Sequence, residues 1–487
     1  MTRPSILVGA ALVGAATLLC SPGCSKQDST GDPWMATTTA GSGDDDGGGG
    51  TCSLDASDPP LVFSGGADSA PGRVTALAIA GGTTVWCGAG FVATTDGSVD
   101  LVGTCTGLTV VDETTVAAVS DSGAVVLVSV GNAVSLLASA EVGTVAHDVA
   151  YDGVSLVVAV GAGGVASFDA SSGSLTASAQ LTTALDVRAL AATADGWLVG
   201  GPGHITALGS DGAQKGSLEI RGSVTDVEFR DGLGLVARGP FGFDLVEVSG
   251  NSVTSVGNTP TEGSALDGAL LDGAALLATG AAVHRYDLSG SDAALSARVV
   301  RPDEGRLVGE WVAAVAASGD SAVASVGTQV HALTLGGDSG GAVALLPRTT
   351  TSLFGEGDSE VVVLVRNGGN AELVLGELSV DGALAVASVE GGEARDGCEG
   401  QWTVPPGGSL LVTLEGSVPA GAAEVDLRLA TNDANHEVLA LPIEINRPSL
   451  AVGQPAPDFT MITFGGDVID LDTTLGEIVF LKLFSYS

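Results

Sequence analysis

Cysteine and histidine are the side chains of this sequence best suited to nucleophilic or metal chemistry, and both are sparse. The chain of 487 residues has six cysteines and five histidines, and no two cysteines are separated by only two residues. That spacing is typical of dithiol redox sites and of many zinc sites. His284 and His331 occupy equivalent positions in two repeated segments, and His204 lies in a third, but such repeated polar positions usually face solvent or a neighbouring sheet. We therefore expect no metal site, no bound cofactor and no catalytic residue within this sequence.

One serine lies in a protease-like motif. Residues 337–341 read Gly-Asp-Ser-Gly-Gly, which matches the sequence around the nucleophile of trypsin-like proteases and would make Ser339 catalytic. No segment typical of that family's catalytic histidine precedes it, and the motif follows the last repeat in a glycine-rich connection. We interpret the match as a coincidence.

Repeated units of about 36 to 43 residues occupy positions 58–340. Each unit opens with an apolar strand, turns at Asp-Gly or glycine, and continues through further strands. The copies begin near Thr75, Val110, His147, Asp186, Thr225, Ala269 and Val312. This period, with three or four strands per unit, predicts a seven-bladed β-propeller, with a parallel β-helix as the alternative. The repeats resemble loosely the LVIVD-type extracytoplasmic propellers.

A second β module is expected at residues 342–448, where the repeats stop. The segment 361–373, with Asn367, Gly369 and Asn370, resembles the N-x-G-N-x-x-L core of bacterial Ig-like modules. The segments 402–409 and 427–433 resemble the turn and late strand of the same modules. The resemblance implies an Ig-like β-sandwich that acts as a spacer, although sandwich modules can also bind ligands.

The N-terminus is typical of an export signal. Arg3 precedes an apolar run at residues 6–19 that is too short to span a bilayer comfortably. The following Cys20-Ser-Pro-Gly-Cys24 resembles a bacterial lipoprotein signal, which implies removal of residues 1–23 and acylation of Cys24. We expect an envelope lipoprotein, with the outer membrane favoured because Ser25 is not the aspartate that retains enteric lipoproteins in the inner membrane. Acylation at Cys20 and an unlipidated secreted form are the alternatives.

Residues 24–57 are expected to be a disordered Gly/Asp/Ser tether. Apart from Cys20 and Cys24 the chain has four cysteines, and an exported protein can oxidise them. Cys87 and Cys105 fall on neighbouring predicted strands and could form a disulfide, whereas the spacing assigns no partner to Cys52 or Cys398.

The composition narrows the class of function. The net charge of -39 and the pI near 4.1 oppose binding to nucleic acid or to anionic membrane surfaces. The 73 glycines and 4% aromatic residues favour short strands with tight turns over long helices.

The last segment, 449–487, resembles the opening of a thioredoxin-like redoxin of the alkyl hydroperoxide reductase/thiol-specific antioxidant type. Residues 453–459 (Gly-Gln-Pro-Ala-Pro-Asp-Phe) match the family's G-x-x-A-P-D-F, residues 465–471 match its hairpin, and residues 478–484 match its buried central strand. In that family a redox cysteine follows, and the alignment puts it at position 488. We expect a gene truncation, an assembly break or a UGA-encoded selenocysteine there, and favour the last.

Two classes of function stay open. The redoxin resemblance implies a mainly β, envelope-anchored protein whose full-length form is a thiol-dependent oxidoreductase or peroxidase, with an α/β domain after the sandwich. It would be inactive without the residues past 487. The alternative is a non-catalytic binding or scaffold lipoprotein whose propeller holds an unidentified protein or small molecule.

Overall fold

The structure is a computed structural model of the chain, whose compact units are residues 1–50 and 51–487. All residues described below belong to the second unit. They are 52–54, 61–131, 133–170, 173–181, 185–261, 263–280, 282–290, 292–299, 312–336, 342–345, 360–380, 384–416, 423–445, 460–462 and 468–470. These residues contain no helix, and hence none that could cross a membrane.

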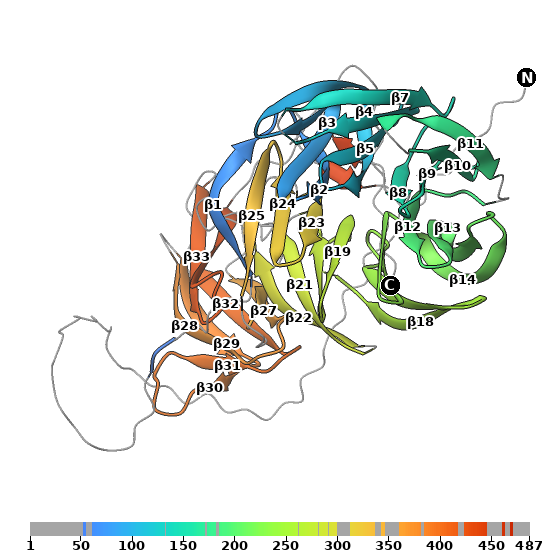
Figure 1. Ribbon diagram of the computed structural model, residues 1–487. Helices are drawn as coiled ribbons and strands as arrows, with labels where there is room; N and C mark the ends of the chain where they lie inside the picture. Colours follow the sequence, from blue (N-terminus) through green and yellow to red (C-terminus); the bar gives the residue numbers. More distant parts are fainter. Residues whose placement is uncertain are drawn as a thin grey trace, which may run out of the picture. The chain divides into compact units, whose positions relative to one another are not determined.

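Residues 61–335 form small antiparallel sheets, as the alternating apolar pattern predicts (Figure 1). The first two sheets in chain order are β2 (Val74–Ala80), β3 (Thr83–Thr94), β4 (Gly97–Asp112), β5 (Thr115–Ser120), β6 (Ala124–Ser129) and β7 (Ser135–Glu141), then β8 (Asp148–Tyr151), β9 (Ser155–Ala159), β10 (Val165–Asp169) and β11 (Thr176–Leu181). The next two are β12 (Ala189–Thr193), β13 (Gly196–Gly209) and β14 (Gln214–Ser223), then β15 (Asp226–Arg230), β16 (Leu233–Ala237), β17 (Phe243–Ser249) and β18 (Ser252–Thr259). The last two are β19 (Asp267–Leu271), β20 (Ala274–Ala278), β21 (Val283–Ser289) and β22 (Asp292–Val299), then β23 (Val315–Ser318), β24 (Ser321–Val326) and β25 (Gln329–Leu335) with β1 (Leu61–Ser69).

The sheets close into a ring. The inner strands contact one another in the order β2, β4, β8, β12, β15, β19 and β23, and β23 returns to β2. The ring is closed by the N-terminal strand β1, which pairs antiparallel with β25, from Leu61 opposite Leu335 to Ser69 opposite Gln329. This radial arrangement of small sheets is that of a β-propeller, so the mainly β prediction is confirmed.

Tight turns at Asp-Gly give the ring its short hairpins. Between β15 and β16, Asp231 (φ 51°) and Gly232 (φ 88°) both adopt the left-handed conformation. A two-residue hairpin with this geometry favours Asp or Asn followed by Gly, since other residues are strained there.

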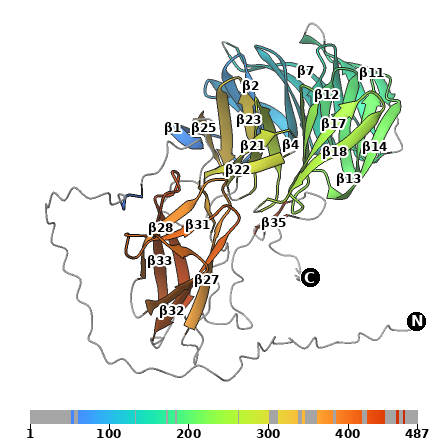
Figure 2. The same cartoon turned by 90° about the horizontal axis from the view of Figure 1, so that it is seen from below.

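Two further sheets pack face to face into a sandwich (Figure 2). One contains β26 (Ala344–Leu345), β27 (Glu360–Asn367), β32 (Ser409–Gly416) and β29 (Leu384–Glu390). The other contains β30 (Glu393–Ala394), β31 (Trp402–Val404), β28 (Leu373–Val380), β33 (Ala423–Thr431) and β34 (Val438–Ile445). Asn367 is 1% exposed, and its Nδ2 donates to the carbonyl oxygens of Ala371 and Val404, both at 2.8 Å. The asparagine of the predicted motif therefore ties a turn of one sheet to a strand of the other.

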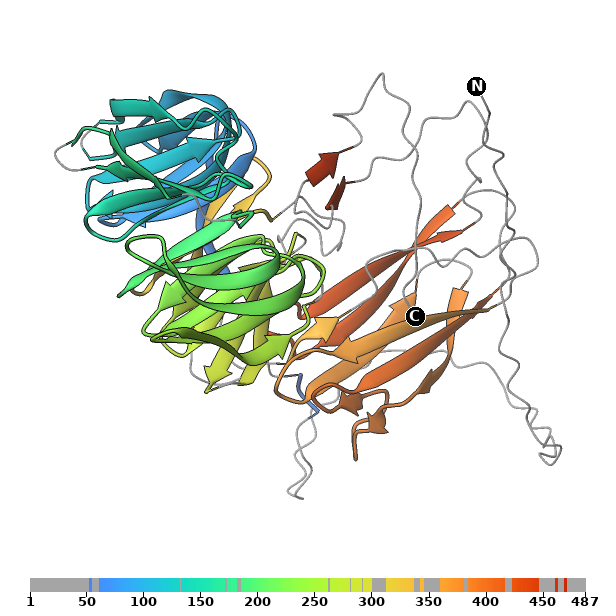
Figure 3. The ribbon, with the colours of Figure 1, turned by 90° about the vertical axis from the view of Figure 1, so that its right-hand side faces the viewer.

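The redoxin-like segment is described only in part. β35 (Thr460–Ile462) and β36 (Val468–Asp470) form an antiparallel hairpin, with Met461 opposite Ile469 (dark red in Figure 3). The expected central strand at residues 478–484 lies outside the described residues. The described residues contain no helix, which conflicts with the expected α/β character of this part.

Candidate functional site: a carboxylate-lined cavity

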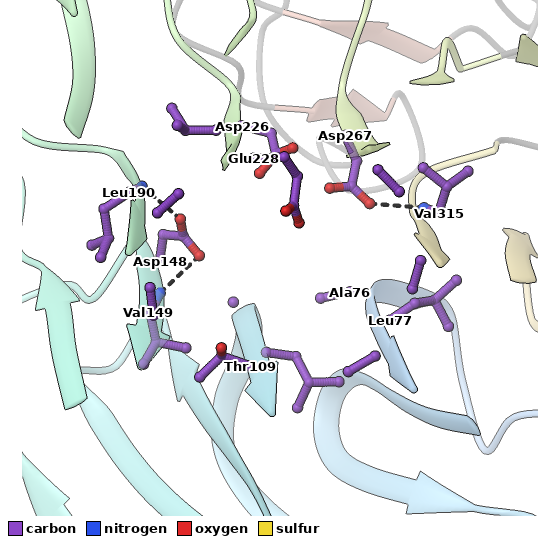
Figure 4. Close-up of a pocket in the computed structure, with 18 of the residues that line it drawn as sticks. Ala76, Leu77, Thr109, Asp148, Val149, Leu190, Asp226, Glu228, Asp267 and Val315 are labelled. Atoms are coloured by element: carbon purple, nitrogen blue, oxygen red, sulfur yellow. Dashed lines mark hydrogen bonds between the residues drawn. The ribbon is translucent and has the colours of Figure 1, made fainter. Parts of the chain in front are cut away.

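A cavity of about 530 Å³ lies where the inner strands of the ring meet. It is lined by residues of β2, β4, β8, β12, β15, β19 and β23 and by the residues just before several of these strands (Figure 4). Most of the lining residues are Ala, Val, Leu and Thr. The ionisable ones are Asp148, Tyr151, Asp226, Glu228, Asp267 and His147, and no lysine or arginine is among the described residues of the lining.

Three aspartates of the cavity share one structural role. Each lies at the first position of an inner strand, and one of its carboxylate oxygens accepts a hydrogen bond from a backbone amide at the start of the next inner strand. These bonds join Asp148 Oδ2 to Leu190 N (2.8 Å), Asp226 Oδ2 to Gly268 N (2.9 Å) and Asp267 Oδ2 to Val315 N (2.7 Å). Because adjacent sheets are not hydrogen-bonded through a ladder here, the carboxylates satisfy amides that would otherwise be unpaired.

Packing around Asp148 explains why position 107 in the cavity lining is a glycine. A Cβ atom on Gly107 would lie 2.7 Å from Asp148 Oδ1 and 2.9 Å from its Cα. Only glycine lets β4 approach β8 this closely.

Glu228 differs from the three aspartates. Among the described residues its carboxylate has no hydrogen-bond partner, and Figure 4 shows it reaching into the open centre of the cavity from β15. Glu228 pairs with Leu235 on β16, the second strand of its sheet, and the strand pairing in the other sheets gives the equivalent position on each of the other inner strands. Those positions hold Ala78, Thr109, Ala150, Ala191, Ala269 and Ala316. Glu228 is therefore the one long side chain in a ring of small ones.

Desolvation in the cavity and mutual repulsion raise the pKa values of these four carboxyls. Burial, and then the charges of Asp226 and Asp148, raise the pKa of Glu228 to about 8. Burial also raises the pKa of Asp226 to about 6, although hydrogen bonds from the amides of Gly268 and Val227 and from the side chain of Asp267 oppose the rise. The pKa values of Asp148 and Asp267 are raised well above the ordinary value, first by burial and then by the charge of Asp226.

The carboxylates give the cavity an arrangement that is suited to binding a cation. Within the described part of the chain no group of three or more His, Cys, Asp or Glu side chains is placed to hold a metal ion. An organic cation remains suitable, because an ammonium or guanidinium group needs only an acceptor of opposite charge and a cavity of its size.

The histidines singled out from the sequence lie away from this cavity. His284 is fully buried, with its Nδ1 3.3 Å from the Tyr286 hydroxyl, and His331 packs on Phe63 with ring centroids 5.0 Å apart. Nδ1 of His204 lies 3.1 Å from the carbonyl oxygen of Pro202. Ser339 and Cys24 are outside the described residues.

The four cysteines in the described part of the chain form two disulfides. Cys87 and Cys105 are joined across β3 and β4, with a Cα–Cα distance of 5.8 Å and both residues buried. Cys52 is joined to Cys398, 346 positions away, with a Cα–Cα distance of 5.4 Å. The spacing of the cysteines in the sequence does not predict this second pair.

The comparisons with known proteins identify no family. No family model matches the chain, and no curated protein matches it. Among solved structures, the Cps50 (Swd1) β-propeller domain of Myceliophteria thermophila is 12% identical, with a TM-score of 0.47, and the match covers 57% of this chain and all of that domain. The computationally designed protein Ika8 is 13% identical, with a TM-score of 0.43, over 58% of this chain and 98% of Ika8.

Proposed function

We propose that this chain is an exported, non-catalytic binding protein whose propeller binds an organic cation in its central cavity. The observation that carries the proposal is Glu228. Within the described part of the chain its carboxylate has no hydrogen-bond partner, the equivalent positions hold small residues, and the cavity lining has no lysine or arginine. The Glu228 carboxylate reaches into the cavity, where a cationic ligand would supply a partner of opposite charge. The net charge of -39 would also raise the local concentration of cations.

In this proposal the ring has seven blades of four strands. β3 pairs with β2 up to Gly88 and with β4 from Ala89, and β4 pairs with β3 up to Thr104 and with β5 from Cys105. Each of these long strands therefore supplies two blade strands, and the six-stranded sheet divides into two blades of four. β13 likewise pairs with β12 in its first half and with β14 in its second. The sandwich is proposed to be an Ig-like spacer, and the two disulfides support an oxidising compartment outside the cytoplasm. Acylation of Cys24 would anchor the protein to the envelope.

Calorimetric titration with putrescine tests the ligand class, because this diamine offers ammonium donors and fits a cavity of this size. We expect saturable binding at pH 9, where Glu228 is ionised, and weaker binding at pH 6. Tetramethylammonium, a cation without N–H donors, should bind more weakly, and an oligolysine peptide would show whether a protein side chain can supply the cation.

The variant Glu228→Gln keeps the size of the side chain and removes its charge. We expect it to weaken putrescine binding about tenfold or more, as is usual for a lost charged hydrogen bond. Glu247→Gln is the matched control, since Glu247 is exposed on β17 of the same sheet and does not line the cavity. Equal binding by both variants, or no saturable binding of any cation, would exclude the cavity as the proposed site.

A second candidate function rests on the C-terminal hairpin. β35 directly follows the redoxin-like motif at residues 453–459, and its partner β36 lies within residues 465–471, where the resemblance expects a hairpin. That candidate is a lipoprotein whose full-length form reduces disulfides or peroxides with a thiol reductant. Sequencing the gene through codon 488 tests it: an in-frame thioredoxin-like continuation after UGA would support it, and an ordinary stop without one would exclude it.

A further inference from the structure

The segment that precedes the ring is fastened to the sandwich (blue trace beside β28 in Figure 1). Cys52 forms the disulfide with Cys398, and the backbone of residues 52 and 53 makes further contacts. Gln401 Nε2 donates to the carbonyl oxygen of Cys52 at 2.9 Å, and Arg395 Nη1 donates to that of Ser53 at 3.1 Å. One covalent bond and two hydrogen bonds therefore hold residues 52–53.

An apolar contact extends this attachment. The side chain of Leu54 lies over Gly376 in β28, where a Cβ atom would come within 2.5 Å of Leu54 Cδ1. The receiving loop is itself ordered by backbone hydrogen bonds from Cys398 N to Arg395 O (3.0 Å) and from Gln401 N to Cys398 O (3.2 Å). Glycine at position 376 thus provides space for the leucine, and the loop presents Cys398 in a fixed position.

The ring is inserted between two attachments to the same sandwich. After residues 52–54 the chain continues into β1, and after β25 it enters the sandwich at Ala342, Val343 and Ala344, which are at most 8% exposed. A force applied to the N-terminal segment would therefore be transmitted to the sandwich through Cys398 before it acted on the ring.

The strand that this attachment would hold in place is β1. It lies at the end of its sheet, pairs only with β25, and is the one strand of that sheet not joined to its neighbour by a hairpin. Its first residue, Leu61, is fully buried in the cluster shared with the last sheets of the ring. An edge strand held only by one ladder opens from its free end, so fixing the chain just before Leu61 opposes that opening.

We propose that the Cys52–Cys398 disulfide is a clamp that anchors the N-terminal segment on the sandwich and keeps the ring-closing strand β1 in place. Cys52 is exposed, whereas Cys87 and Cys105 are buried, so a mild reductant should open the clamp before it opens the disulfide inside the ring. The clamp does not involve the central cavity, so its test is independent of cation binding.

Hydrogen exchange of the full chain, followed by mass spectrometry, tests the clamp. The Cys52→Ser/Cys398→Ser variant should exchange the amides of β1 and their partners in β25 about tenfold faster than the unmodified protein, with β8 to β11 unchanged. The Cys87→Ser/Cys105→Ser variant is the control, since it removes a disulfide but leaves the clamp, and it should accelerate exchange in β3 and β4 instead.

Selective reduction gives a second route that needs no variant. Mild reductant should expose the thiols of Cys52 and Cys398 first, as seen by alkylation and peptide mapping, and the exchange of β1 should rise with the fraction reduced. Unchanged exchange of β1 after the clamp is fully reduced would overturn the proposal. A uniform rise over the whole ring would also overturn it, because the disulfide would then stabilise the ring generally rather than its closing strand.

Discussion

The ring and the sandwich bury their apolar side chains in different ways. The sandwich has one continuous core, in which leucines of both sheets meet: Leu373, Leu375, Leu384, Leu410, Leu414, Leu427, Leu429, Leu439 and Leu441. The ring instead has separate smaller clusters between neighbouring sheets, and these are rich in alanine and valine. Fewer apolar atoms are buried in each of these clusters, so each stabilises its pair of sheets less.

This difference explains why closure matters to the ring and not to the sandwich. A sandwich with a shared core loses little when an outer strand frays, because the two sheets still cover each other. In the ring every sheet depends on two neighbours, so loss of β1 removes support from the last sheet and exposes the cluster around Leu61. The aspartates at the cavity add contacts between sheets in the region where the strands are most crowded.

Matched leucine-to-alanine changes in the two modules should have the largest effect. Leu427→Ala in the sandwich and Leu198→Ala in the ring each remove a fully buried side chain, and each should cost about 3 kcal/mol. In scanning calorimetry we expect two transitions, with each variant lowering only its own. Leu411→Ala is the control, since that leucine is 38% exposed on the sandwich surface and should cost less than about 0.5 kcal/mol. If both buried variants lower one common transition, the modules unfold together and the comparison fails.

Strand periodicity made the β architecture predictable, because alternation and Asp-Gly turns are local properties of the chain. The Cys87–Cys105 pair was suggested for the same reason, since its residues are 18 positions apart on neighbouring strands. Two features were not local and were missed. The sequence did not indicate that β1 would pair with β25, or that Cys52 would meet Cys398.

The cavity was missed for a different reason. Residues 148, 226 and 267 each begin a repeat, and this position was treated only as a boundary of the repeat. The side chain at position 228 reaches into the cavity, and the position that strand register makes equivalent is alanine or threonine in the other inner strands. Aligning the repeats by register rather than by composition would have shown one glutamate among small residues.

Substitution of Asp226 should have an intermediate effect and separates its two roles. Asp226→Ala removes the acceptor for the Gly268 amide and should destabilise the ring by about 1 to 2 kcal/mol. Asp226→Asn keeps an acceptor oxygen but removes the charge, so at pH 8 it should be at least as stable as the parent. Chemical denaturation at pH 5 and pH 8 measures both variants. Equal losses for alanine and asparagine would show that the charge, rather than the hydrogen bond, stabilises the ring.

The pH dependence of the ring transition should be the smallest effect, and its sign is fixed by the raised pKa values. The folded state holds Glu228 with a pKa of about 8 instead of 4.5 and Asp226 with one of about 6 instead of 3.8, so between pH 4 and pH 8 it binds more protons than the unfolded chain. Stability should therefore be greatest near pH 4 to 5 and fall as the pH rises to 8.

The Glu228→Gln variant measures how much of this dependence of stability on pH comes from one side chain. Because Glu228 is partly exposed to water in the cavity, we expect the variant to be more stable than the parent by only about 1 kcal/mol at pH 8 and equal to it at pH 5. The four carboxyls all lie in the ring, so calorimetry should show this change in the ring transition and leave the sandwich transition in place. A saturating cation should remove the difference in the stability of the ring between pH 5 and pH 8 in the parent. A bound ammonium group would offset the desolvation cost of the ionised carboxyl, which otherwise favours the protonated form. If the stability of Glu228→Gln falls with pH as much as that of the parent, the aspartates alone produce the pH dependence. Glu228 is then better solvated than its position at the centre of the cavity implies.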